Sequence, residues 1–156
     1  MESKKVSDSK SERVEIIMAG HTNGYKRLFG GQLMEWIDVV AGAVARRHSG
    51  CNVTTASIDN LQFKAAAYAN SMVVIKGKMT YVGKTSMEIK VDTFVEDLNG
   101  TQKDINHAYL VLVALDENDK PKPVPGLILE TQEERAEWDA GLKRHNLRKQ
   151  RRKEAY

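Results

Sequence analysis

The chain has 156 residues, of which 41% are hydrophobic and 29% are charged, and its formal net charge is +3. This length suits one domain, and no apolar run reaches the roughly 18 residues that a membrane helix needs. A single cysteine, Cys51, excludes an internal disulfide and a cysteine-rich zinc site.

The positive charge is concentrated at one end of the chain. Residues 143–156, KRHNLRKQRRKEAY, hold seven Lys or Arg and one Glu, whereas the rest of the chain is mildly acidic. This distribution excludes a uniformly basic nucleic-acid-binding domain. The basic tail could bind a phosphate group, an acidic partner or nucleic acid, but a solvated helix end is the simpler interpretation.

The N-terminal third is expected to contain a short strand and one long helix. Residues 1–10 are polar and are predicted to form a disordered tail without a signal core, which favours a cytoplasmic protein. In RVEIIM, apolar residues alternate with charged ones, as in a strand. After a loop, a helix is predicted from about Gly31 to His48, with Gly50 as its stop signal.

The middle of the chain reads as four strands, within 53–63, 73–81, 87–95 and 108–115. Most alternate between apolar and polar residues, which is the habit of an antiparallel sheet with one buried face. Three prolines in DENDKPKPVPG then end the sheet, because proline cannot donate to a ladder. Thr131 and Glu134 form a capping box before a second helix, on which Trp138 and Leu142 are expected to pack against the body.

This element order indicates an α+β fold. One long helix lies among antiparallel strands without a βαβ rhythm, so a sheet curled around a central helix is expected to bury that helix on nearly all sides. Residues 11–130 form the predicted domain, and 131–156 form a C-terminal helix with the basic tail.

The central helix carries one unexpected acid. From Trp36 to Ala45, in WIDVVAGAVA, every residue except Asp38 is apolar or glycine. No Lys or Arg stands three or four positions away to pair with its carboxylate, and burial of an unpaired carboxylate is costly. Asp38 is therefore either a functional acid or a structural one that binds a group elsewhere.

The start of the same helix has no conventional cap. FGGQL offers no Ser, Thr, Asp or Asn, so the first N–H groups need another acceptor. Gly30 and Gly31 would let a ligand approach this backbone, where a carbonyl oxygen would be polarised. The alternative is a simple tight turn.

These residues resemble the signature of the acyl-CoA thioesterases of the hot dog fold. The resemblance rests on HTN…LFGGQLMEWID and continues through VTTASIDNLQF, YVGKTSMEIKVDTFVE and LVLVALDENDKPKPVPGL, over about residues 12–135. It implies an antiparallel sheet wrapped around a central helix, and a dimer assembled further into a hexamer. The implied reaction is hydrolysis of acyl-CoA to a free acid and coenzyme A, with no cofactor beyond the substrate and no metal.

The resemblance also assigns roles to residues. Asp38 would be the catalytic acid, as general base or nucleophile, with Asn23 contributed by the partner subunit. Gly30 and Gly31 would polarise the thioester carbonyl, and the turn Gly83, Lys84, Thr85 and Ser86 would contact coenzyme A. From the residues alone, this turn reads as a hairpin connection.

Two stretches depart from the family pattern. AAAYANS (65–71) replaces a Pro and a Gly-Asp turn, and Lys26 stands where glycine is often found. A loop near the pantetheine channel is expected to differ, and the loop that enters the site to be stiffer.

Three alternatives remain open at this point. They are a non-catalytic acyl-CoA-binding sensor, another hot dog acyl-thioester enzyme such as a hydratase or dehydratase, and a nucleic-acid-binding module that works through residues 143–153. The helix carries no His near Asp38 for a dehydratase, and we expect neither a membrane nor a nucleic-acid partner.

Overall fold

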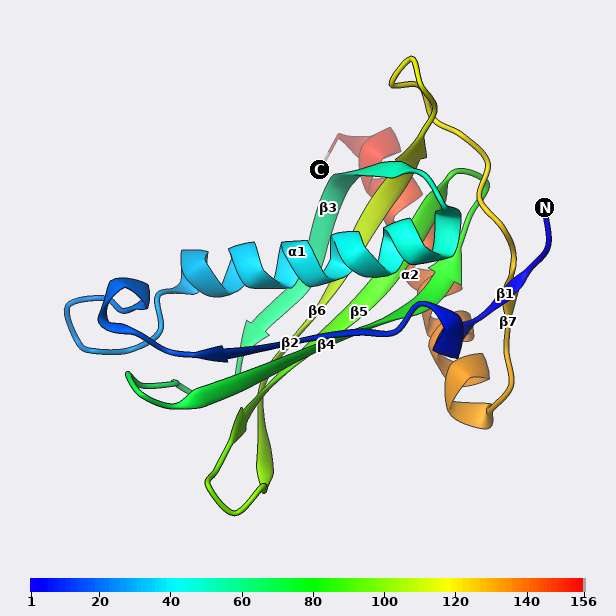
Figure 1. Cartoon of the computed structure of the whole chain (residues 1–156). Helices are drawn as coiled ribbons and strands as arrows, with labels where there is room; N and C mark the ends of the chain where they lie inside the picture. The colour runs from blue at the N-terminus through cyan, green and yellow to red at the C-terminus, as the bar shows by residue number, and fades with distance from the viewer. Residues whose placement is uncertain (156) are drawn as a thin grey trace.

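The structure is a computed structural model that describes residues 1–155, with only the backbone of Asn60. One antiparallel sheet in the order β2-β4-β5-β6-β3 curls around helix α1, and helix α2 lies on its other face (Figure 1). The main elements are β2 (Ser11–Ile16), α1 (Gly30–Ser49), β3 (Asn52–Phe63), β4 (Met72–Val82), β5 (Ser86–Glu96), β6 (Gln102–Leu115) and α2 (Gln132–Glu154). The predicted α+β class and the sheet wrapped around a helix are confirmed.

The inner face of the sheet forms the core. Met87, Ile89 and Val91 alternate along β5 and are fully buried, as the sequence pattern predicted. On β4, Gly77 lies directly beneath the helix, because a Cβ there would stand 2.9 Å from Cγ1 of Val40. The missing side chain therefore allows α1 to approach the sheet closely.

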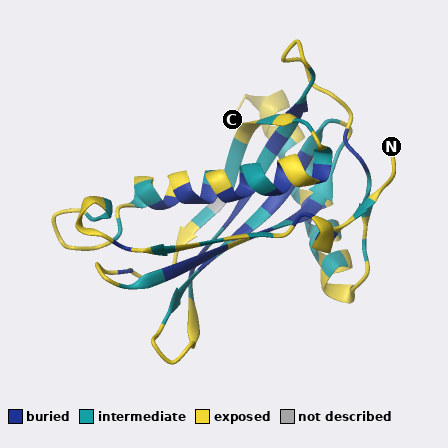
Figure 2. Ribbon diagram, viewed as in Figure 1, coloured by how far each residue is buried: buried dark blue, intermediate teal, exposed yellow. Residues whose placement is uncertain are grey.

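Helix α1 is buried on one side only. Trp36, Ile37 and Val40 are among its buried residues, whereas Met34 and Val39 are 38% and 52% exposed. Figure 2 shows the buried stripe on the side that faces the sheet. The expectation of burial on nearly all sides is wrong for the single chain, because the half-open sheet covers only one face of the helix.

Helix α2 packs on the outer face of the sheet. Its N-terminus is capped by Thr131, whose Oγ1 accepts a 3.1 Å hydrogen bond from the N–H of Glu134, so the predicted capping box is present. The Trp138 ring lies 4.5 Å from that of Tyr81, as expected for a residue packed on the body. Leu142 is 40% exposed, so that part of the prediction is wrong.

The first ten residues are not a disordered tail. Lys4 and Lys5 form β1, which pairs in parallel with β7 (Leu127–Ile128), and a 3₁₀ turn follows (Val6–Asp8). Val6 is 2% exposed. The polar composition of this segment predicted disorder, but backbone pairing with β7 and the burial of Val6 give it an ordered structure.

Across residues 1–155, no helix is both long and apolar enough to cross a bilayer.

Candidate active site

Asp38 is held by a hydroxyl from the sheet. Thr55 of β3 donates a hydrogen bond of 2.6 Å from Oγ1 to Oδ1 of Asp38. The bond joins the exposed side of α1 to the edge strand of the sheet. It satisfies one carboxylate oxygen, and no hydrogen bond within the described residues engages Oδ2.

The carboxylate opens into a cavity of about 550 Å³ between α1 and β3. The walls are mostly apolar or small, with two arginines at one end. Arg47 is turned away, because its guanidinium donates to the carbonyl of Lys10 and to Ser11 Oγ. The cavity lining consists of Asp38, Val39, Gly42, Ala43, Arg46, Arg47, Val53, Thr55 and Leu112. A carboxylate that lines such a space, with one oxygen fixed and the other without a hydrogen bond among the described residues, is suited to accept a proton from water or to attack a carbonyl.

Asn23 lies in the loop before α1 and is exposed. Its Oδ1 accepts hydrogen bonds from the N–H groups of Tyr25 (2.9 Å) and Arg27 (3.3 Å). These two backbone donors fix the oxygen, whereas the amide Nδ2 is a separate group with two hydrogens to donate. No acceptor for Nδ2 occurs among the described residues, so it is available to a ligand or to another subunit.

The loop around Asn23 requires one left-handed residue, Lys26, with a φ of 61°. Such a backbone conformation is costly for a side chain with a Cβ and is free for glycine. This explains why glycine often occupies the position in the resembling family. In the other departing stretch, Asn70 has a φ of 71°, which asparagine tolerates better than most residues.

The start of α1 is uncapped, as the sequence predicted. Phe29 is the N-cap residue and makes no side-chain capping bond. The N–H groups of Gly30 and Gly31 have no hydrogen-bond acceptor within residues 1–155. The Phe29 ring lies over Gly31, where a Cβ would come within 2.6 Å of it. Two free amides at the positive end of a helix dipole can polarise a carbonyl oxygen.

These groups do not meet within one chain. Gly30 precedes Asp38 by eight helical residues, which corresponds to roughly 12 Å along the axis. Asn23 lines a separate cavity of about 310 Å³, together with Arg27, Leu28, Leu33, Phe63, Lys64, Ala65, Ala66, Ala67 and Ile105. One small substrate group could therefore not touch Asp38 and the helix start of the same subunit.

The turn of residues 83–86 connects β4 and β5, as a hairpin reading predicts. The N–H of Gly83 donates to the carbonyl of Ser86 at 2.9 Å. Lys84, Thr85 and Ser86 line a further cavity, on the outer face of the sheet beside α2. Three of the four residues assigned to coenzyme A binding are therefore brought together there.

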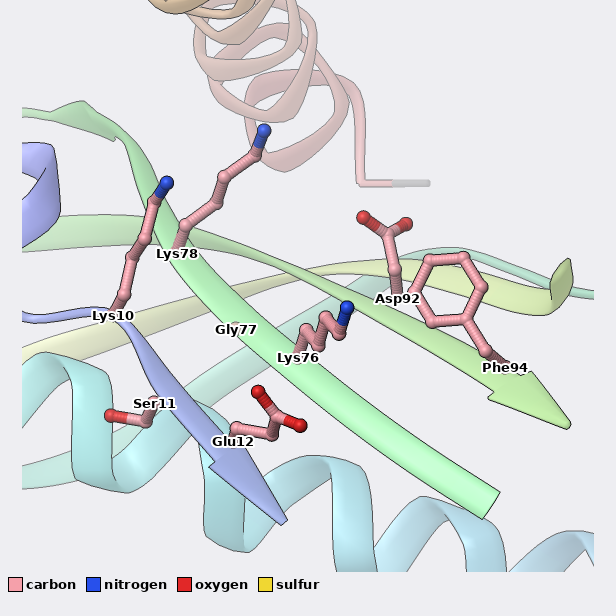
Figure 3. A pocket seen from close by; sticks show the side chains of 8 residues that line it. All are labelled: Lys10, Ser11, Glu12, Lys76, Gly77, Lys78, Asp92 and Phe94. Atoms are coloured by element: carbon pink, nitrogen blue, oxygen red, sulfur yellow. The ribbon is translucent and has the colours of Figure 1, made fainter. Parts of the chain in front are cut away.

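Another cavity, of about 290 Å³, lies on the outer face beside β2, β4 and β5 (Figure 3). It contains both signs of charge, with Lys10, Lys76 and Lys78 near Asp92. Burial raises the pKa of Asp92, although Lys90 and Lys78 act to lower it. None of the predicted site residues lines this cavity.

The histidines form no catalytic or metal-binding cluster. The His21 ring packs edge-on against Trp36 at 4.9 Å and accepts the N–H of Met18, so it has a structural role. His48 is buried and bonds the carbonyl oxygen of Pro125. Within residues 1–155, no three His, Cys, Asp or Glu side chains are grouped to hold a metal ion.

Sequence reasoning missed Thr55 and the part that α2 plays. Thr55 lies in VTTASIDNLQF, where two adjacent threonines offered no sign of which one faces α1. The basic tail is not a freely solvated helix end, because Arg144 and Arg148 bind Glu88 on the sheet. The unbalanced positive charge of residues 143–156 was the sequence feature that could have indicated these ion pairs.

A family model and the similar known proteins all indicate the same family. A model described as the thioesterase superfamily matches residues 25–101. YkhA of Bacillus subtilis, an uncharacterized acyl-CoA thioester hydrolase, is 35% identical over 147 residues, covering 94% of this chain and 86% of YkhA. The cytosolic acyl coenzyme A thioester hydrolase of Mus musculus is 32% identical over 144 residues, covering 90% of this chain. The chain spans only 38% of that longer protein.

Solved structures that resemble this chain indicate the same family. An acyl-CoA hydrolase from Staphylococcus aureus, in complex with butyryl coenzyme A, coenzyme A and coenzyme A disulfide, has a TM-score of 0.93 and 34% identity, covering 98% of this chain and 94% of that one. Variants of that hydrolase with an aspartate, an asparagine or a threonine replaced by alanine have also been solved. A hexameric acyl-CoA thioesterase has a TM-score of 0.92 and 33% identity, covering 97% of each chain. The chain belongs to the thioesterase superfamily and, within it, to the hot dog acyl-CoA thioester hydrolases.

Proposed function

We propose that this protein hydrolyses acyl-CoA thioesters to a free acid and coenzyme A, with Asp38 as the catalytic carboxylate. The single observation that carries the proposal is the carboxylate of Asp38, which Thr55 fixes at one oxygen and which lines a cavity beside α1. A second support is the Staphylococcus aureus hydrolase, whose altered aspartate, asparagine and threonine have the same spacing along the chain as Asp38, Asn23 and Thr55.

The complete site is composed of two subunits. Asn23, Gly30 and Gly31 come from one subunit, and Asp38 comes from its partner. This arrangement is supported by the separation of roughly 12 Å between Gly30 and Asp38 along one helix, because a thioester carbonyl cannot bridge it. In the partner arrangement, the free amides and Nδ2 of Asn23 face the carbonyl oxygen and Asp38 faces the carbonyl carbon.

The chemistry follows from these positions. As a general base, Asp38 takes a proton from water, and the resulting hydroxide attacks the carbonyl carbon. The C–S bond then breaks, and the coenzyme A thiolate takes the proton back from Asp38. As a nucleophile, Asp38 instead forms an acyl anhydride that water hydrolyses in a second step. In either case the developing oxyanion is stabilised by the amides of Gly30 and Gly31.

Coenzyme A is bound by the turn that contains Gly83, Lys84, Thr85 and Ser86. The hydroxyls and the ammonium group suit phosphate and pantetheine oxygens. Because a carboxylate and water are sufficient for this hydrolysis, the proposal needs no metal or cofactor beyond the coenzyme A of the substrate.

We further propose a dimer built through the exposed face of α1 and the free edge of β3, with three dimers in a hexamer. The exposed apolar side chains Met34 and Val39, and the unpaired edge strand, support the first contact. The hexameric relative supports the second. A cytoplasmic location is proposed on the name of the mouse relative.

The proposal is tested by thiol release from a panel of acyl-CoAs, from acetyl to palmitoyl. Turnover by the folded wild type on at least one chain length is expected, and the best substrate will show which acyl chain length the site accepts. If the folded protein binds acyl-CoA and hydrolyses none of the panel, a sensor role replaces the hydrolase.

A further inference from the structure

The C-terminal half of α2 closes a cavity of about 550 Å³ against the outer face of the sheet. Strands β3 and β6 form its floor, with small or apolar side chains and the hydroxyl of Ser57. Thr85 and Ser86 of the β4–β5 turn add two further hydroxyls. One carboxylate, Asp59, lines the cavity, and five cations surround it, namely Lys84, Arg148, Lys149, Arg151 and Arg152.

A buried carboxylate fixes this part of the helix. Glu88 of β5 is 1% exposed, and both its oxygens accept hydrogen bonds from the guanidinium of Arg144, at 2.8 and 3.0 Å. Arg148 donates to Glu88 at 3.1 Å and also to Asp59 at 3.1 Å. Burial alone would lower the pKa of Arg144, but the hydrogen bond and charge of Glu88 outweigh it and raise that pKa. These two arginines therefore hold the helix against the sheet through their ion pairs.

The remaining cations around the cavity have no close ion-pair partner among the described residues. Lys84, Lys149 and Arg152 have no ion-pair or side-chain hydrogen-bond partner among the described residues. Arg151 reaches Asp59 only at 3.7 Å. A cluster of like charges around a small cavity raises its electrostatic potential and attracts an anion. Separate elements contribute to it, since Lys84 comes from the turn and the others come from the helix.

We propose that this cavity binds the phosphorylated nucleotide end of coenzyme A, with Lys149, Arg152 and Lys84 contacting its phosphates. The inference rests on the proposed function, because it takes acyl-CoA as the substrate. It adds the basic tail to the binding site and assigns α2 the task of distinguishing coenzyme A from thioesters that lack phosphate.

The position of the cavity supports this assignment. Thr55 lines the Asp38 cavity, whereas its neighbours Ala56 and Ser57 line the cationic cavity. The two cavities are therefore separated by the edge strand β3. A long flexible ligand with an acyl group at one end and phosphates at the other can reach both at the proposed dimer interface, where β3 meets its partner.

The test compares three ligands by titration calorimetry with the full-length protein. Coenzyme A, dephospho-coenzyme A, which lacks the 3′-phosphate, and pantetheine, which lacks every phosphate, are measured with the wild type and with Lys149→Gln/Arg152→Gln. Charged hydrogen bonds to phosphate are strong enough that we expect the double variant to bind coenzyme A about tenfold more weakly or worse. The loss should be smaller for dephospho-coenzyme A and absent for pantetheine.

A matched control removes the same charge from the same helix. Lys143 and Lys153 do not line the cavity, so Lys143→Gln/Lys153→Gln should change the affinity for coenzyme A less than twofold. Free adenosine 3′,5′-bisphosphate should compete with coenzyme A. If it binds without displacing coenzyme A, the cavity serves a separate nucleotide, and the inference is wrong.

Two other results would overturn the inference. One is an equal loss of affinity for coenzyme A and pantetheine, and the other is an equal effect of the control variant. Failure of the proposed function is distinguishable, since calorimetry needs no turnover. A protein that binds the three ligands in the expected order and hydrolyses no thioester would retain the inference and lose only the hydrolase activity.

Discussion

The hydroxyl of Thr55 donates a 2.6 Å hydrogen bond to the carboxylate of Asp38, across the gap between the edge strand and the central helix. A short bond of this kind to a charged acceptor orients the carboxylate and leaves the other oxygen for chemistry. It also connects β3 to the only charged residue of the apolar stretch from Trp36 to Ala45. Both residues are therefore expected to affect turnover, but to different degrees.

Replacement of the acid is expected to remove most of the activity. Asp38→Asn keeps the size of the side chain but cannot accept a proton or attack the thioester. We expect turnover to fall by about 10²–10⁴-fold, with a smaller change in KM, in a thiol-release assay. Asp139→Asn, an exposed acid on α2, should leave turnover within twofold. Comparable losses in both variants would mean that the effect is one of folding or charge.

Removal of the orienting hydroxyl should have a smaller effect. Thr55→Val preserves shape and removes the donor to Asp38, so we expect kcat to fall by about tenfold, because one charged hydrogen bond is lost. Thr55→Ser restores the donor and should recover most of kcat, which a purely structural role of the methyl group would not allow. If the valine variant retains full kcat, Thr55 does not position Asp38.

The docking of α2 makes a prediction about stability. Arg144→Ala leaves the buried carboxylate of Glu88 with Arg148 and the Thr80 hydroxyl as its remaining partners. Loss of one partner of a buried ion pair should reduce the free energy of unfolding by about 3 kcal/mol, measured by urea denaturation. The comparison variant is Lys78→Ala, which breaks a pair with Glu133, a side chain that is 76% exposed.

Because Glu133 lies largely in solvent, this pair should contribute less than about 1 kcal/mol. Equal losses in the two variants, or a loss below 1 kcal/mol for Arg144→Ala, would contradict the role assigned to Glu88.

The buried His48 predicts a loss of stability on acidification. Burial lowers the pKa of His48 below 6.5, and this outweighs the hydrogen bond to the Pro125 carbonyl. The unfolded chain therefore binds the proton first, so stability is full above pH 6.5. It declines as the pH falls from 6.5 through the lowered pKa of the folded state.

Urea denaturation between pH 7.5 and 5 measures this decline. His48→Gln can still donate to Pro125 but cannot titrate, so its stability should vary less in this window. The comparison is made in a His145→Gln background, because burial and neighbouring cations also lower the pKa of His145. Identical pH profiles for the two proteins would exclude His48 as the source.

The sequence contained enough information for the fold but only for part of the site. The alternating pattern of β5 and the Gly50 stop signal located their elements, since both depend on neighbours along the chain. Gly50 indeed adopts a left-handed φ of 68° after α1. The Lys4–Lys5 pairing with β7 could not be predicted, because two residues have no periodicity and their partner lies far along the chain.

Two site features depended on the same kind of long-range contact. A bulge between Thr55 and Ser57 breaks the alternation of β3, so no pattern could indicate that Thr55 faces Asp38. On α2, Gly141 rather than Leu142 meets the sheet, where a Cβ would come within 2.7 Å of Tyr81. The side of α2 that meets the sheet is therefore determined by the close packing of Gly141 and by the ion pairs with Glu88. A pattern of hydrophobic residues reveals neither contact.

The central claim, that Asn23 and Asp38 act from different subunits, is tested most directly by mixing two inactive variants. Asn23→Ala and Asp38→Asn are co-expressed in equal amounts, and thiol release is measured on the assembled protein. Half of the dimers then contain one subunit of each kind, and each mixed dimer has one intact site and one doubly altered site. A site shared between two subunits predicts about a quarter of wild-type turnover, because a two-fold dimer has two equivalent sites. Co-expression of Asp38→Asn with Asp38→Ala is the control and should remain inactive. Activity of the mixture no higher than that of the single variants would place both residues in one subunit and exclude a shared site.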